Sequence, residues 1–289
     1  MRTRGITRVL SSAALQAAAL ALAAVYVMPM LYVLVTALQP DGHAIGDLWP
    51  HGFHWQNFTD AWRSAAVATT LVNSAVVTIC STAIQVGLAC MAGYALARLP
   101  FRGRDAFFLL LIAMLVIPPE VTLVPLFVLA DHVPLAGGND LAGQGGTGLL
   151  NTFPGLMIPH LTSALSIFLM RQFYVSMPEA LADAARIDGA SEWTILWRIY
   201  TPLAWPAVVT VAVFAFQGAW NDFLWPLVAT RTNDMQTAQL GLTVFFQANS
   251  TQWSLLCAAV ILISIPVLVL FLVGQRRFQE GVMVGAVKQ

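Results

Sequence analysis

The sequence predicts an all-α membrane protein with six transmembrane helices and both termini in the cytoplasm. Of its 289 residues, 58% are hydrophobic and only 10% are charged, whereas soluble proteins are about 45–50% apolar and about 25% charged. The mean hydropathy of +0.74 indicates that the surplus apolar surface faces lipid. A spanning helix needs about 20 apolar residues. Six stretches are long enough: 13–38, 71–97, 106–130, 149–173, 202–229 and 254–273.

Two of these stretches need separate arguments. Basic residues precede the first stretch, as in a cleaved secretory signal, but its apolar run continues through 25–35, past the small residues at 21–24. We therefore expect a retained helix. The third stretch contains Pro118, Pro119 and Glu120. Because prolines interrupt helical hydrogen bonds and a carboxylate is costly at depth, we expect a bent or broken helix that faces the protein interior.

The basic residues predict the orientation. With a cytoplasmic N-terminus, 12 of the 14 lysines and arginines lie on the cytoplasmic side, and only Arg63 and Arg231 lie outside. This distribution follows the positive-inside rule, and an even number of spans then places both termini inside. The twelve are Arg2, Arg4, Arg8, Arg98, Arg102, Arg104, Arg171, Arg186, Arg198, Arg276, Arg277 and Lys288.

Composition also excludes several kinds of site. The formal net charge is zero, so no basic surface for nucleic acid is expected. The three cysteines at positions 80, 90 and 257 lie in apolar runs without C-x-x-C spacing and predict neither a disulfide framework nor a zinc site.

Two segments are expected on the outer side. His43, His51 and His54 in 39–68 are metal-ligand types, but nothing completes a ligand set, so a loop with interfacial tryptophans is favoured over a metal site. The glycine-rich segment 137–148 lacks the lysine of a phosphate loop, and we expect a flexible loop there.

The cytoplasmic segment 174–201 predicts two short helices joined by a turn, which we call the elbow (179–200). Ser176 and Glu179 have the spacing of a capping box, so a first helix is expected from Glu179 to Asp188. Gly189 fits the left-handed residue that ends such a helix. Ser191 can then cap a second helix, 192–200, that stops before the proline at 202.

Alanines at 180, 182, 184 and 185 make the first elbow helix thin, and Asp183 and Arg186 are spaced to pair on one face of it. A thin helix can enter a groove of another protein. A connecting loop that only covers the ends of the spans is an equal alternative on these grounds.

The elbow resembles the EAA loop of binding-protein-dependent ATP-binding-cassette (ABC) importers, E-A-A-x3-G-x9-I-x-L-P. Residues 183–189 read D-A-A-R-I-D-G, and Ile199 and Pro202 follow at the spacing of that pattern. Asp183 replaces the glutamate and Thr201 the leucine. Residues 218–226 (G-A-W-N-D-F-L-W-P) and 285–288 (G-A-V-K) resemble the carbohydrate-uptake, maltose-type branch, and the similarity covers roughly 71–289.

This resemblance implies a type I ABC importer permease in the cytoplasmic membrane of a bacterium or archaeon. Such a subunit pairs with a second permease, sits on two ATPase subunits and receives a sugar from an extracytoplasmic binding protein. It binds no cofactor, because ATP and magnesium belong to the ATPase subunits. The expected domains are 1–66, with the first span, and 67–289, the core permease with coupling loop 174–201. The implied coupling residues are Glu179, Asp183, Ala184, Ala185, Asp188, Gly189, Ile199 and Pro202.

The residues themselves limit the alternatives. A P-loop needs G-x-x-x-x-G-K-[ST], and the only lysine is Lys288, followed by the terminal Gln289, so this chain is not the ATPase. No H-E-x-x-H, G-x-S-x-G or G-x-G-D motif supports a membrane enzyme. The runner-up is an importer of glycerol 3-phosphate or a similar polyol phosphate. An ion-coupled carrier is third, because Glu120, His160 and Asp222 are ionisable residues within spans.

Trp220, Asn221 and Asp222 supply an aromatic ring, an amide and a carboxylate, the groups that bind sugar faces and hydroxyls. With Glu120 they form a candidate substrate path, although packing against the second permease is an equal alternative. Three other polar residues lie inside predicted spans: Asn73, Gln85 and Asn151. We expect these to bond across helices rather than to contact substrate.

Overall fold

The computed structural model describes residues 3–40, 52–246 and 251–286, which form helices and connecting turns without a β-strand. The chain groups into two compact units, Met1–Val67 with Leu242–Ile265 and Ala68–Gly241 with Pro266–Gln289. The predicted division between residues 66 and 67 stays a prediction. Expectations for His43, His51 and Lys288 fall outside the described residues.

In the first unit, α1 (Thr3–Ala37) is apolar enough over Leu15–Ala37 to cross a membrane. Its side chains there are largely exposed, as a helix surrounded by lipid requires. A short helix, α2 (Gln56–Ser64), lies in the predicted outer segment. Asn57 of α2 donates from its side-chain amide to the carbonyls of Ala37 (2.9 Å) and Gln39 (2.8 Å). These bonds satisfy carbonyls that the end of α1 leaves unpaired.

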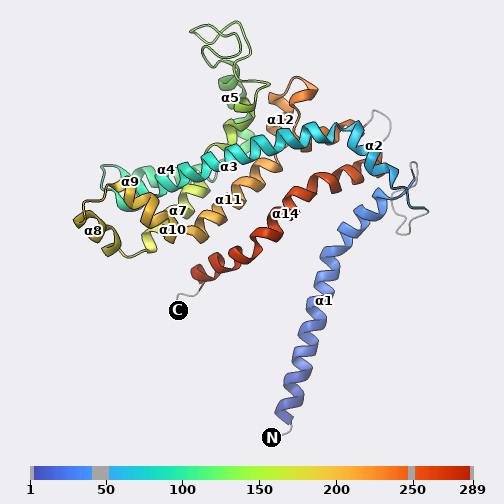
Figure 1. The fold of residues 1–289 in the computed structure, drawn as a ribbon, viewed down its shortest axis with the longest axis horizontal. Coiled ribbons are helices and arrows are strands. Elements are labelled where there is room, and N and C mark those ends of the chain that lie inside the picture. Colours follow the sequence, from blue (N-terminus) through green and yellow to red (C-terminus); the bar gives the residue numbers. More distant parts are fainter. Residues whose placement is uncertain (1–2, 41–51, 247–250, 287–289) are drawn as a thin grey trace. The chain divides into compact units, whose positions relative to one another are not determined.

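The second unit contains α3 (Val67–Arg98), which is also long and apolar enough to cross a membrane. Figure 1 shows α3 as one continuous helix. The α-helices that follow are α4 (Arg104–Met114), α5 (Pro119–Asp131), α6 (Phe153–Met157), α7 (Ala164–Ser176), α8 (Ala180–Ile187), α9 (Glu192–Ile195), α10 (Thr201–Leu203), α11 (Trp205–Trp220), α12 (Leu224–Ala229) and α13 (Ala238–Gly241). The last helix, α14 (Trp253–Ala286), has residues in both units, and its apolar part is Trp253–Val269.

Three of the predicted spans are interrupted helices. The axes of α4 and α5 differ by 104°, so the break predicted from Pro118 and Pro119 is confirmed. The fourth span is also broken: α6 with its 3₁₀ turn Ile158–His160 is bent by 52° relative to α7. The fifth is divided between α11 and α12. There, Asp222 Oδ1 accepts the backbone N–H of Trp225 (3.3 Å) and so helps to start a new helix. The breaks at these last two places were not predicted from the sequence.

Polar side chains and one glycine join the helices of the second unit. The amide of Gln85 in α3 donates to Ser166 Oγ of α7 (2.8 Å). The amide of Asn73 donates to the carbonyls of residues 234 (2.7 Å) and 236 (2.9 Å), and that of Asn151 donates to the hydroxyl of residue 232 (2.9 Å). The predicted bond across helices is confirmed for Gln85, and Asn73 of α3 bonds to the 3₁₀ turn Asn233–Met235 and the residue after it. For Asn151 the prediction was wrong, because Asn151 and its partner both lie in connecting segments rather than in helices. At Gly93, a Cβ would lie 2.7 Å from Met170 Cβ, so α3 and α7 pack closely there.

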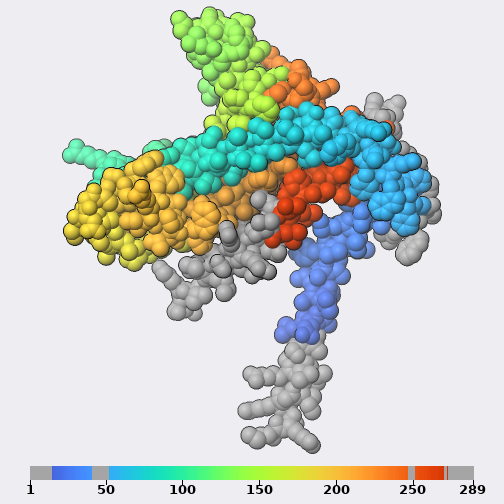
Figure 2. Space-filling view, viewed as in Figure 1, coloured from blue at the N-terminus to red at the C-terminus, as the bar shows by residue number. Residues whose placement is uncertain are grey.

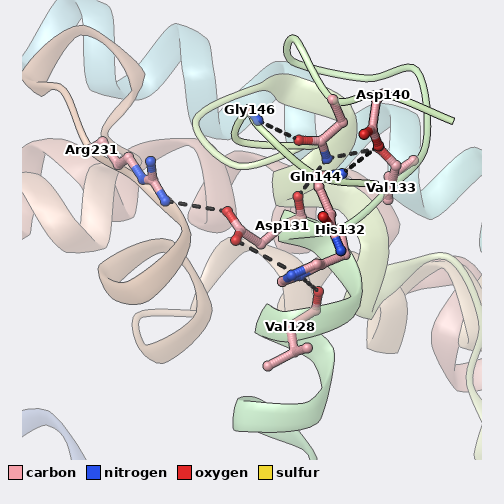
Figure 3. A network of polar contacts seen from close by, with 9 residues as sticks. Val128, Asp131, His132, Val133, Asp140, Gln144, Gly146 and Arg231 are labelled. Carbon is pink, nitrogen blue, oxygen red and sulfur yellow. Dashed lines mark hydrogen bonds and ion pairs between the residues drawn. The ribbon is translucent and has the colours of Figure 1, made fainter. Parts of the chain in front are cut away.

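The glycine-rich segment 137–148 forms a closed loop after α5 (Figure 3). The Asn139 side chain donates to the carbonyls of residues 131 (2.7 Å) and 133 (3.0 Å) and accepts the N–H of Gly146 (2.7 Å). At Gly143 and Gly148, φ is +77° and +54°, and a Cβ would lie within 2.2 Å of a carbonyl oxygen. The glycines therefore permit close backbone contacts. The expected loop is present, and its flexibility stays a prediction.

The base of this loop is fixed to the segment after α12. Arg231 Nη2 lies 3.4 Å from Asp131 Oδ1 at the end of α5 (Figure 3). The backbone N–H of Asn151 donates to the carbonyl of Ala229 (2.8 Å). Two helix ends that are distant in the sequence are thereby held together.

Candidate functional site

The first elbow helix, α8, begins at Ala180, one residue after the position expected from the sequence. The predicted capping box is wrong, because no side chain caps this helix. Ser176 instead ends α7, where its hydroxyl donates to the carbonyl of Phe173 (2.7 Å). Glu179 is exposed at the N-terminal end of α8. A carboxylate there interacts favourably with the helix dipole without a hydrogen-bonded cap.

Gly189 ends α8 as predicted. Its φ is +81°, in the left-handed region. The N–H of Gly189 donates to the carbonyl of Arg186 (3.0 Å), and the N–H of Ala190 donates to that of Ala185 (2.9 Å). These two bonds define a Schellman motif, which satisfies the last carbonyls of the helix. Asp188, just before the glycine, is exposed.

The second elbow helix starts at α9, where Ser191 Oγ accepts the N–H of Thr194 (3.3 Å), so this predicted cap is confirmed. It continues as a π-helix, Leu196–Tyr200, and then as α10. The predicted stop before Pro202 is wrong. Pro202 lies in the first turn of α10, where its missing N–H is tolerated, and the chain bends by 85° between 192–203 and α11.

The elbow has one buried face and one exposed face. Ala182 and Ala185 belong to the buried core of the second unit, and Ile199 is partly buried against the same core. Ala184 and Pro202 are exposed. Ile187 at the tip is 87% exposed, which is unusual for an isoleucine. Figure 2 shows the elbow, in yellow to gold, as an open surface at one end of the second unit.

Charged side chains connect the two elbow helices. Arg186 Nη1 lies 2.9 Å from Asp183 Oδ1, which confirms the predicted pair. Arg186 Nε also lies 2.8 Å from Glu192 Oε1 on the second helix. Hydrogen bonds from Arg186 hold the pKa of the Glu192 carboxyl below its usual value, although partial burial opposes the shift. Glu192 was missed in the sequence because the turn that brings it to Arg186 is set by the Schellman geometry.

A second set of residues missed in the sequence holds the elbow to α3. The hydroxyl of Tyr94 donates to Glu192 Oε2 (2.5 Å). Arg98 Nη2 donates to the carbonyl of Tyr174 (2.7 Å) and to that of Met177. The Arg98 guanidinium also lies 5.4 Å from the centroid of the Tyr200 ring. An apolar run with one tyrosine and a terminal arginine gives no local signal for such contacts.

A cavity of about 470 Å³ lies where the three interrupted helices meet. Each interruption contributes an ionisable residue to the lining: Glu120 from the start of α5, His160 from the turn after α6, and Asp222 from the break between α11 and α12. His160 Nε2 lies 2.9 Å from Asp222 Oδ2, and both side chains are 17% exposed. Unpaired backbone at membrane depth is tolerated where it lines a water-filled cavity, and such breaks mark substrate sites in transporters.

Of the two remaining residues of the candidate substrate path, one lines this cavity and the other does not. Asn221 lines it beside Asp222, whereas Trp220 does not and is buried. The Trp220 ring stacks on Phe216, with centroids 5.5 Å apart. Trp225 lines the cavity instead, and its indole N–H donates to the carbonyl of Gly155 (2.9 Å). Among the described residues, no group of three His, Cys, Asp or Glu side chains is arranged to hold a metal ion.

Broken apolar helices around a cavity that holds three ionisable residues, with a projecting helical elbow, define a membrane transport subunit. Residues 85–282 match the family model described as "Binding-protein-dependent transport system inner membrane component". The chain belongs to this family and is an inner-membrane component of an ABC importer.

Several curated proteins are similar over most of their length. The arabinooligosaccharides transport system permease protein AraQ of Halalkalibacterium halodurans is 31% identical over 92% of this chain and 93% of its own. The diacetylchitobiose uptake system permease protein NgcG of Streptomyces coelicolor is 30% identical over 90% and 84%. The sn-glycerol-3-phosphate transport system permease protein UgpE of Yersinia pestis is 31% identical over 79% of each chain.

A chain of a solved bacterial ABC transporter, involved in the import of the acidic polysaccharide alginate, has the same fold. It superposes with a TM-score of 0.75 at 21% identity, over 96% of this chain and 98% of that one. The predicted type I importer permease fold is therefore confirmed. The cytoplasmic placement of the termini stays a prediction.

Proposed function

We propose that this chain translocates an uncharged saccharide as one of two permease subunits of an ABC importer. The charge of the cavity lining carries the proposal. Glu120 and Asp222 supply two carboxylates, His160 supplies at most one positive charge, and no lysine or arginine from the described residues lines the cavity. Carboxylates and the Asn221 amide can bond sugar hydroxyls, whereas they would repel or fail to neutralise a phosphate.

The names of two relatives also support a saccharide, since AraQ is named for arabinooligosaccharides and NgcG for diacetylchitobiose. The runner-up, a polyol phosphate, is supported by the similarity to UgpE. That cargo would require the second permease to supply the positive charge. In this proposal Trp220 fixes the end of α11, and Asn221, Asp222 and Glu120 face the cargo.

The elbow is proposed to dock in a cleft of a separate ATPase subunit, which binds the ATP and magnesium. Three observations support docking: a closed Schellman turn, an exposed acidic residue at Asp183, and an apolar tip at Ile187. A second permease, two such ATPase subunits and an extracytoplasmic binding protein complete the proposed assembly.

The cargo is tested first by thiol modification of the assembled importer in liposomes. The cysteines at 80, 90 and 257 are replaced by alanine, and Asn221→Cys is introduced. The cysteine is then modified with a cationic and with an anionic methanethiosulfonate reagent, and the ratio of the two reaction rates is measured. This cationic-to-anionic rate ratio should be about tenfold higher at Asn221→Cys than at the exposed control Leu141→Cys. Glu120→Gln should lower the ratio. A preference for the anionic reagent would contradict the proposal.

Uptake then separates saccharide from phosphate. Neutral oligosaccharides and glycerol 3-phosphate are offered to the reconstituted importer with its binding protein. If only glycerol 3-phosphate is taken up, the cargo is a polyol phosphate and the saccharide proposal is wrong.

Docking is tested with two exposed apolar residues of similar accessibility. Ile187→Asp should prevent co-purification of the ATPase, because it places a charge in the proposed cleft. Leu141→Asp, on the glycine-rich loop and 81% exposed in the parent chain, should not. Equal ATPase recovery with both variants would contradict docking through the elbow tip.

A further inference from the structure

The contact between α3 and the elbow suggests how movement of the elbow reaches the membrane helices. Glu192, the first residue of α9, uses both carboxylate oxygens. Oε1 accepts from Arg186 Nε of α8 (2.8 Å), and Oε2 accepts from the Tyr94 hydroxyl of α3 (2.5 Å). One carboxylate therefore joins both elbow helices to a membrane span.

Three tyrosine rings extend this connection into the core. The Tyr94 ring packs edge-to-face on Tyr174 of α7 and on Tyr200 of the π-helix, with centroids 6.0 and 5.3 Å apart. The Tyr174 and Tyr200 rings are 5.8 Å apart. All three side chains are at most 2% exposed. Close-packed rings transmit displacement because they cannot be compressed.

The end of α3 makes an independent second connection. The Arg98 guanidinium holds the carbonyls of Tyr174 and Met177, where α7 ends, and lies over the Tyr200 ring. The turn between α7 and α8 is therefore fixed to α3. Without these contacts, the turns on both sides of α8 would be the places where the elbow could pivot.

We propose that Tyr94 and Glu192 are positioning residues that make the elbow and α3 move as one rigid body, so that closure of the ATPase is converted into movement of the spans. This inference rests on the proposed docking of the elbow. It assigns a role distinct from docking, since neither residue belongs to the exposed tip. Loss of the Tyr94–Glu192 bond should leave the ATPase attached but weaken the coupling of the elbow to α3, because only the Arg98 contacts and the ring packing then connect them.

The test compares Tyr94→Phe with Tyr174→Phe in the complete importer. Both variants keep a buried ring and lose a hydroxyl, but the Tyr174 hydroxyl contacts Thr201 Oγ1 (3.4 Å) rather than the elbow carboxylate. We expect Tyr94→Phe to retain the ATPase and to lower the number of cargo molecules transported per ATP by about tenfold, the effect of one hydrogen bond to a charged group. Tyr174→Phe should keep the wild-type ratio.

Glu192→Gln and the double variant complete the test. If both residues act through one bond, the double variant should transport no less per ATP than the more impaired single variant. An unchanged transport ratio in Tyr94→Phe, or equal losses in Tyr94→Phe and Tyr174→Phe, would overturn the proposal. Release of the ATPase by Tyr94→Phe would also overturn it. If instead Ile187→Asp retains the ATPase, docking at the elbow tip fails, and that result is separate from the transport ratio.

Discussion

Replacing Gly189 by valine should impair the coupling of ATP hydrolysis to transport without preventing the protein from folding. At φ +81° an L-residue is strained, but a Cβ at this position would meet no atom within 4 Å. The cost is therefore conformational, about 1–2 kcal/mol for a residue held in the left-handed region. Relief of that strain would open the Schellman turn, whose two bonds of 3.0 and 2.9 Å contribute about 1 kcal/mol each. A domain stable by about 5–15 kcal/mol survives such a loss.

We therefore expect Gly189→Val to insert, to assemble with reduced ATPase affinity and to bind ATP, while cargo-stimulated ATP hydrolysis and uptake fall severely. The matched control is Gly103→Val, because Gly103 has φ +85° and equally open surroundings but lies before α4. Both variants are assayed in proteoliposomes with purified binding protein. Full transport by Gly189→Val would mean that the elbow is only a connector. Equal losses in both variants would mean that backbone strain in general, and not the elbow, is responsible.

Two other predictions concern helix packing and pH. Gly93→Val should prevent a stable complex in detergent, because the valine Cβ would lie 2.7 Å from Met170 Cβ. Gly87→Val on the same helix should be tolerated, because a Cβ there meets no atom within 4 Å. Similar melting temperatures of the two variants would contradict the close packing. The lowered pKa of Glu192 means that its bond to Arg186 stabilises the elbow fully above the usual pKa of about 4.5, and this contribution is lost as the pH falls through the lowered value. Hydrogen-exchange protection of residues 180–200 should therefore fall in acid in the wild type and change less in Glu192→Gln, and identical acid profiles would refute this assignment.

The parts of the fold that local signals determine were predictable from the sequence. Apolar length located the spans, Gly189 marked the end of α8, and the Ser191 cap marked the start of α9. Ser176 illustrates the limit of such signals, because its hydroxyl bonds the helix that precedes it rather than the one that follows. Whether a serine ends one helix or begins the next depends on packing that the motif does not encode.

The contacts that position the elbow were not predictable, because they join residues far apart in the chain. Tyr94 and Glu192 are separated by 98 positions. The cavity also depends on residues that are distant in the sequence. Glu120, His160 and Asp222 were each recognised as ionisable residues in spans, but only the three helix breaks bring them together. The ring of Trp225 was found at the cavity and that of Trp220 was not, since the break after α11 turns the chain between them.

The interrupted third span also constrains how the protein is made. An isolated α4–α5 segment would present the Glu120 carboxylate to lipid, and a charge at the centre of a span costs about 2.5–3.5 kcal/mol on insertion. The residues that line the cavity together with Glu120 are synthesised later, since Asp222 follows Glu120 by 102 positions. We therefore expect the third span to reach its stable place only after the fourth and fifth have entered the bilayer, so that membrane insertion and tertiary folding of this subunit are coupled.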